Sequence, residues 1–134
     1  MNRNLPTVAI FITAFVYIGF ALWLGSNPRA LLTAFAIDQS TPQMLTEIRA
    51  FYGGVELAIA AAMFLLWWRG DTFAAALIGG LPLAGSVSGR LLGQLMDGYS
   101  AMHLGLAIPE AIGAVVCFLA CWQVRNRASG TDEG

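Results

Sequence analysis

The sequence predicts an all-α protein, an integral membrane bundle of four antiparallel helices, and three observations lead to this fold class. Of the 134 residues, 57% are hydrophobic and only 11% are charged, whereas soluble domains carry about 25% charged residues. The mean hydropathy is +0.68. Four apolar segments are long enough to be spans, because a helix needs about 20 residues to cross a bilayer core about 30 Å thick.

The apolar runs predict the positions of the spans and of the links between them. We expect one transmembrane domain over residues 1–134 with spans at about 6–25, 46–68, 72–96 and 101–124. Short polar links join the last three spans and make them antiparallel neighbours. The longer link, 26–45, holds Asn27-Pro28, a favourable helix start, and predicts a short interfacial helix over about 28–36. The polar tail 129–134 is expected to be loose.

The first apolar run resembles a signal peptide only superficially. It exceeds the about 7–15 residues of such a segment, and no clear small-residue cleavage site follows it, so we expect it to be retained. Positive charge then orients the bundle. Both termini and the second link lie on the same side of the membrane. This side holds most of the arginines, namely Arg3, Arg69, Arg125 and Arg127. Because arginines favour the cytoplasmic side, we expect both termini in the cytoplasm.

Charge and cysteine usage remove several functional classes. The chain has seven arginines, no lysine and a net charge of −1, so it offers no basic surface for nucleic acid. Cys117 and Cys121 lie four residues apart in an apolar run, which favours small packing residues over a redox pair. No tight spacing of ligand residues predicts a metal site, and the sequence leaves the identity of any cofactor unknown.

Ionisable residues inside the predicted spans gather in the outer half of the membrane. Glu56 and Glu110 should both lie about 15 Å below the outer surface, at a rise of 1.5 Å per residue. Spacings of three, four and seven place the polar residues on one stripe per helix. The three stripes are Arg49, Tyr52 and Glu56 in the second span, Ser86, Arg90 and Gln94 in the third, and His103 and Glu110 in the fourth.

These stripes should meet in one interior cavity, because a charge that faces lipid costs several kcal/mol. Arg90 is permanently charged, and Glu56 and Glu110 are the carboxylates nearest its depth. Those eight stripe residues are therefore our candidate ligand-binding residues, and Glu56 and Glu110 are also candidates for acid–base catalysis. A purely architectural reading stays open, since a buried ion pair can simply fix helix register. The first span shows no polar stripe.

A second stripe on the third span consists of small residues. Gly85, Gly89 and Gly93 repeat every four residues and so share one helical face. Small residues at this spacing allow membrane helices to approach closely. We therefore expect this stripe to pack against another helix.

The motifs in 47–56 and 85–93, with Asp97-Gly98, His103 and Glu110, resemble the bacterial membrane family catalogued as domain of unknown function 4345. The resemblance runs from the first span to the fourth. It implies a four-helix fold in the bacterial inner membrane and brings no established activity. The layout is more distantly similar to DoxX- and DoxD-like proteins. Some of those are tied to quinone or thiol chemistry, but this chain lacks a cysteine pair at two-residue spacing.

Three functions remain open from the sequence. The first is a pocket for a small lipid-like or quinone-like molecule, with or without an enzymatic step at Glu56 or Glu110. The second is an accessory or scaffold subunit of a larger membrane complex, or of a homo-oligomer. The third is proton-coupled transport, since mid-membrane carboxylates often relay protons. The lipid bilayer is the one partner that all three share.

Overall fold

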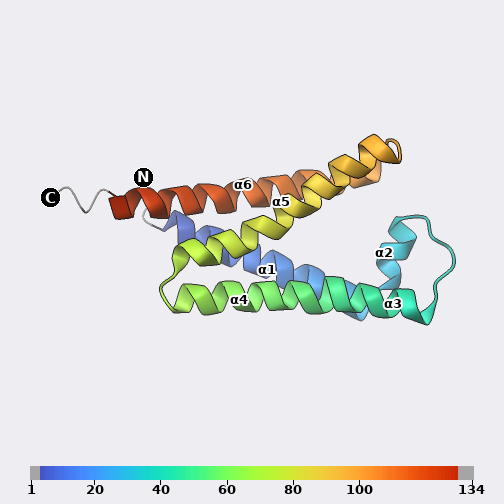
Figure 1. Ribbon diagram of the computed structural model, residues 1–134. Coiled ribbons are helices and arrows are strands. Elements are labelled where there is room, and N and C mark those ends of the chain that lie inside the picture. The colour runs from blue at the N-terminus through green and yellow to red at the C-terminus, as the bar shows by residue number, and fades with distance from the viewer. Residues whose placement is uncertain (1–3, 130–134) are drawn as a thin grey trace.

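The computed structural model describes residues 4–129, and within this range every regular element is a helix. Figure 1 shows the elements in chain order. They are α1 (Leu5–Ser26), α2 (Arg29–Ala34), α3 (Pro42–Ile48), the π-helix η1 (Arg49–Val55), α4 (Glu56–Trp68), α5 (Thr72–Met96) and α6 (Ala101–Ser129). Because α3, η1 and α4 follow one another without a break, they form one long rod.

Four of these helical stretches are long and apolar enough to cross a membrane, which confirms the predicted bundle of four spans: Leu5–Ser26, Pro42–Trp68, Thr72–Met96 and Ala101–Arg127. Large apolar side chains on the outside agree, since Trp68 is 82% exposed and Leu95 is 84% exposed. Such surface is expected where lipid replaces water. The chain is therefore a multi-pass membrane protein.

The second span begins at Pro42, earlier than the expected residue 46, because the sequence places a helix start there. The side chain of Thr41 accepts a hydrogen bond from the Met44 backbone N–H at 3.2 Å, and Pro42 occupies the first turn. The fourth helix also continues beyond the expected residue 124, to Ser129. Residues 130–134, most of the predicted loose tail, lie outside the described part of the chain.

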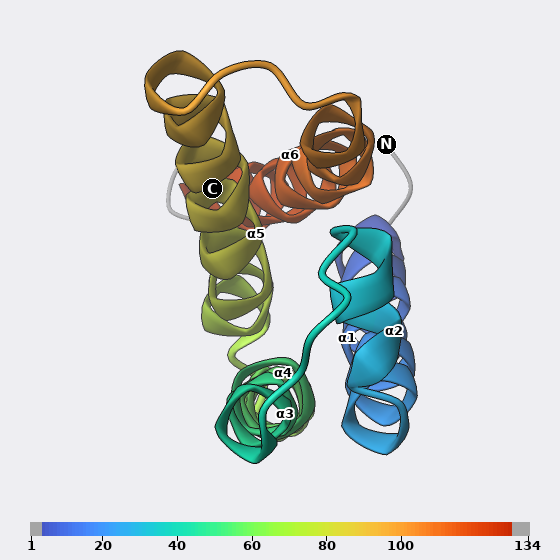
Figure 2. The ribbon, with the colours of Figure 1, turned by 90° about the vertical axis from the view of Figure 1, so that its right-hand side faces the viewer.

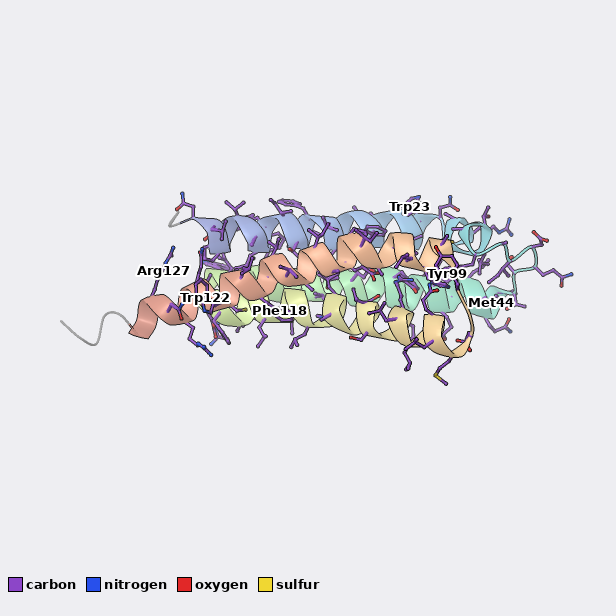
Figure 3. The ribbon with its side chains drawn as sticks, turned by 90° about the horizontal axis from the view of Figure 1, so that it is seen from above. Trp23, Met44, Tyr99, Phe118, Trp122 and Arg127 are labelled. Carbon is purple, nitrogen blue, oxygen red and sulfur yellow. The ribbon has the colours of Figure 1, made fainter. Side chains whose placement is uncertain are left out.

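The bundle has two different ends. We call the end with the 27–41 loop and the 97–100 turn the loop end, and the opposite one, where α1 begins and α6 finishes, the terminal end (Figure 1). Viewed from the loop end, α1, α4, α5 and α6 stand around a common centre (Figure 2). Aromatic side chains mark both ends, with Trp23 and Tyr99 at one and Trp122 at the other (Figure 3). This distribution is typical of the two membrane interfaces.

The short helix predicted between the first two spans is present as α2. It folds back on the loop end of the bundle (Figure 2). Its Leu32 is buried with Leu24 of α1 and Ile48 of α3 in a small apolar cluster. This contact fixes the 27–41 loop against the ends of two spans.

The terminal half of the bundle is densely packed. The largest fully buried side chains are Ile10, Met63 and Cys117, and many of their buried neighbours are alanines. The sulfur of Cys117 lies 3.4 Å from the Thr13 hydroxyl. Both cysteines are buried as free thiols. The open space at this end is a recess of about 390 Å³ at the very end of the helices, lined by Asn4, Thr7, Thr72 and Arg127 among others.

The expectation that the glycine stripe of α5 packs against another helix was wrong. A Cβ added at Gly85 or Gly89 would meet nothing within 4 Å, and one added at Gly93 would meet only Asp97 of its own helix. The close contacts lie further towards the terminal end. A Cβ at Gly80 would come within 2.9 Å of the Cys117 Cβ, and Gly79 and Gly113 are similarly confined. Gly85 is exposed, and Gly89 and Gly93 border an open space and not another helix. This agrees with the slant of α5 away from α4 toward the loop end (Figure 1).

This difference predicts opposite effects of one substitution at two positions of α5. Gly80→Ala should destabilise the protein by about 1–3 kcal/mol, because the new methyl group overlaps the Cβ of Cys117 on α6. Gly85→Ala should be neutral or stabilising by up to about 1 kcal/mol, since alanine favours the helix and has space there. Denaturant unfolding in bicelles measures both, and equal destabilisation would contradict the assigned packing.

Candidate functional site

An ion pair between α5 and α6 lies at the centre of the loop half. The Arg90 guanidinium donates from Nε to Glu110 Oε2 at 2.9 Å and from Nη2 to Glu110 Oε1 at 2.8 Å. The two side chains are only 16% and 20% exposed. Two parallel N–H···O bonds form the fork geometry that is specific to arginine and a carboxylate. The pair therefore fixes the relative rotation of the two helices as well as neutralising the guanidinium.

His103 extends this pair toward the loop end. Its Nδ1 lies 3.2 Å from Nη1 of Arg90. Because an arginine N–H can only donate, Nδ1 is the acceptor, and the neutral imidazole then carries its proton on Nε2. The ring also stacks on Phe35, just after α2, at a centroid distance of 5.0 Å. The interfacial segment is thus in direct contact with the buried charge network.

A cavity of about 370 Å³, which we call the deep cavity, lies between the second span and α5. Its walls are largely apolar and include Phe51, Val55, Ile59 and Leu83. The polar side chains that reach it come from all four spans: Tyr17 from α1, Glu47, Tyr52 and Glu56 from the second span, Ser86 and Arg90 from α5, and Glu110 from α6. An apolar cavity with a few convergent polar groups is the usual form of a small-molecule site.

A second space of about 590 Å³, the mouth cavity, lies nearer the loop end. It is lined by the last turns of α5, the 97–100 turn and His103. The two cavities share Tyr52, Ser86 and Arg90. These three side chains therefore form the boundary between the polar mouth and the deeper apolar space.

Glu56 is the least satisfied polar group of this region. It lines the deep cavity at the first turn of α4. Its Oε2 is buried and has no hydrogen-bond partner among residues 4–129. Leaving a buried polar atom unpaired costs about 1–3 kcal/mol, and more for a charged one. Of the two predicted acid–base candidates, Glu110 is occupied by Arg90 through both oxygens, whereas Glu56 is free to meet another group.

The structure brings most of the predicted site residues together. Those that line one or both cavities are Tyr52, Glu56, Ser86, Arg90, Gln94, His103 and Glu110. Gln94 has a local role as well, because its amide bonds both the backbone oxygen and the backbone N–H of Ser100, at 2.8 and 2.7 Å. This clamp holds the turn between α5 and α6.

Arg49 does not join them. It is exposed, lines neither of the two cavities and donates from Nε to the Gly25 carbonyl at 3.3 Å. That carbonyl belongs to the last turn of α1, where unpaired carbonyls attract a positive charge. Helical spacing could only show that Arg49 shares a face with Tyr52 and Glu56. It could not show that the Gly25 carbonyl at the end of α1 lies within reach of the Arg49 side chain.

Sequence reasoning missed two features of the site. The first span does present a polar group: Tyr17 lines the deep cavity and its hydroxyl donates to the Gly79 carbonyl at 3.0 Å. The signal was a tyrosine in mid-span, since a buried phenol needs a partner in the membrane. The other feature is η1, whose wider turn contains Gly53, packed on Gly25 of α1. Such π segments often occur at functional sites.

The described residues also bear on metal binding. Among residues 4–129, no three His, Cys, Asp or Glu side chains lie close enough to hold one metal ion. The polar groups that converge on the deep cavity are three carboxyls, three hydroxyls and the paired guanidinium of Arg90, and they are suited to hydrogen bonding with an organic molecule.

Comparison with known proteins agrees with the architecture. No curated protein and no solved structure matches the chain. Residues 6–122 match the family described as Domain of unknown function (DUF4345). That match spans all four transmembrane helices and every residue of the site described above. The chain belongs to this family.

Proposed function

We propose that this protein binds a small lipid-like or quinone-like molecule in the deep cavity, with the polar end of the molecule directed toward Arg90 and Glu56. The observation that carries the proposal is the combination of one apolar cavity with one buried, unpartnered carboxyl oxygen on Glu56. A ligand that fills the space and bonds this oxygen would remove two sources of instability at once.

The size of the cavity supports a small ligand. Its volume of about 370 Å³ lies in the range of roughly 300–1,000 Å³ that is usual for small-molecule sites. Its apolar walls, such as Phe51 and Leu83, suit a hydrocarbon chain or ring. Entry from the mouth cavity would pass Tyr52, Ser86 and Arg90, which border both spaces.

The two halves of the bundle differ in a way that favours binding over proton-coupled transport. A transport path would have to continue from Glu56 through the terminal half. There the core is formed by tightly packed side chains such as Ile10, Met63 and Ala76. The deep cavity does not continue into this core, so it suits a ligand that enters and leaves from the loop half.

Blocking the cavity should remove the ligand. Ser86→Phe places a large ring at the boundary of the two cavities, and we expect it to lower the bound fraction of co-purified small molecule at least tenfold. Ser88→Phe is the matched control, because Ser88 lies on an exposed part of the same helix. Native mass spectrometry from mild detergent measures both occupancy and stoichiometry. Equal retention by the two variants, or an empty wild-type protein, would contradict the proposal.

We also propose that the terminal end faces the cytoplasm and that the membrane is the bacterial inner membrane. Three arginines support this orientation, Arg69 in the turn between α4 and α5, and Arg125 and Arg127 near the end of α6. Arg29 lies at the opposite end, in α2. Clusters of arginine in short segments near the membrane favour the cytoplasmic side.

Reporter fusions test this orientation. Alkaline phosphatase needs disulfides that form only outside the cytoplasm, so we expect it to be inactive when fused after Gly134 and active when inserted after Asp38 in the 27–41 loop. Green fluorescent protein at the C-terminus should fluoresce. The reverse pattern of activities would show that the arginine distribution has been misread.

A further inference from the structure

The charges around the two cavities are unequal. Carboxylates dominate the lining, with Glu47, Glu56 and Glu110 in the deep cavity and Asp97 in the mouth cavity. Arg90 is the one arginine that lines either space. A ligand therefore meets an environment that is rich in hydrogen-bond acceptors and poor in positive charge.

The charge of Arg90 is already neutralised. Two of its N–H groups are held by the Glu110 carboxylate, and a third is directed at Nδ1 of His103. Two of its five N–H groups remain, so Arg90 can still donate to a neutral carbonyl or ether oxygen. An anionic head would find no unpaired positive charge there, and the ionised form of Glu56 would repel it.

Glu56 accepts in either protonation state. The ionised carboxylate offers only acceptor oxygens, and the protonated acid keeps one acceptor oxygen beside its O–H. Its buried Oε2 has no partner among residues 4–129. The complement of such a group is a donor, either a hydroxyl or an ammonium.

We infer that the ligand of the deep cavity is an amphiphile whose head is not anionic and donates hydrogen bonds, an alcohol or an amine on an apolar body, and that Glu56 receives this donor. The inference rests on the proposed function and names the ligand class for the same site. Fatty acids and phosphate monoesters are disfavoured, because Arg90 is already paired with Glu110 and an ionised Glu56 would repel them. A quinone that only accepts would bind less well than its reduced, hydroxyl-bearing form.

Three photoreactive probes with the same saturated chain test the inference in phosphatidylcholine nanodiscs at neutral pH. One ends in a primary alcohol, one in a primary amine and one in a carboxylic acid. Cross-linked sites are found by peptide mass spectrometry, and labelling of the less exposed walls at Ile59 or Leu83 reports occupancy of the deep cavity. We expect the alcohol and the amine to label these positions at least tenfold more than the acid.

Variants of Glu56 identify the receiving group. Glu56→Leu removes every acceptor and should lower alcohol and amine labelling about tenfold. Glu56→Gln keeps an acceptor oxygen without the charge, so it should retain the alcohol and weaken the amine. Asp38→Asn, in the loop outside both cavities, is the control and should leave all labelling unchanged. Thermal unfolding in nanodiscs verifies that each variant is folded.

The outcomes separate the inference from the proposed function. If the acid labels the cavity as strongly as the alcohol, the donor class is wrong while the binding function stands. If alcohol labelling is unchanged in Glu56→Leu, Glu56 is not the receiving group and the inference fails. If no probe labels the walls of the deep cavity, both the inference and the proposed function are overturned.

Discussion

A guanidinium inside a membrane stays charged and has to be neutralised within the protein. Arg90 meets this requirement through the bidentate bond to Glu110, and the rest of the loop half follows from it. The pair ties α5 to α6, and α5 moves away from α4 toward the loop end (Figure 1). Arg90 bonds Glu110, and Oε2 of Glu56 on the second span has no partner among residues 4–129.

Tight packing in the terminal half stabilises the bundle although the helices separate in the loop half. Small residues such as Gly79 and Gly80 let α5 lie directly against Met63 and Cys117, so the helices are held firmly at one end. Toward the other end the contacts are made by longer polar side chains and by the loop. Phe35 on His103 and Leu32 on Ile48 connect the interfacial segment to both sides of the opening. The two cavities of the site therefore lie in the loop half, beside a tightly packed core in the terminal half.

Much of the fold could be predicted from the sequence, because each span is an uninterrupted apolar run with short polar links. The bounds of α5 agree with the expected span, and the structure adds the cap, in which Asp71 accepts from the Ala74 N–H at 2.9 Å. Matching depth and the cost of exposed charge predicted both Glu56 and Glu110 near Arg90, and in the structure Glu110 makes the bidentate bond. Neighbouring helices decided the rest. Arg49 was expected at the cavity, but it bonds the end of α1, and the sequence around Arg49 does not show that α1 ends nearby. The stripe from Gly85 to Gly93 was expected to contact another helix, but the tilt of α5 relative to its neighbours cannot be derived from the spacing of its glycines.

The most direct test of the central interaction is a double-mutant cycle between Arg90 and Glu110, measured by denaturant unfolding in bicelles with Arg90→Gln, Glu110→Gln and the double variant. Each single variant should cost about 3 kcal/mol or more, because it leaves one buried charge unpaired. The double variant should cost clearly less than the sum, with a coupling energy above the about 0.6 kcal/mol that is average for interhelical hydrogen bonds in membranes. Additive costs would show that the two side chains do not interact, and the site built around their pairing would fall with it.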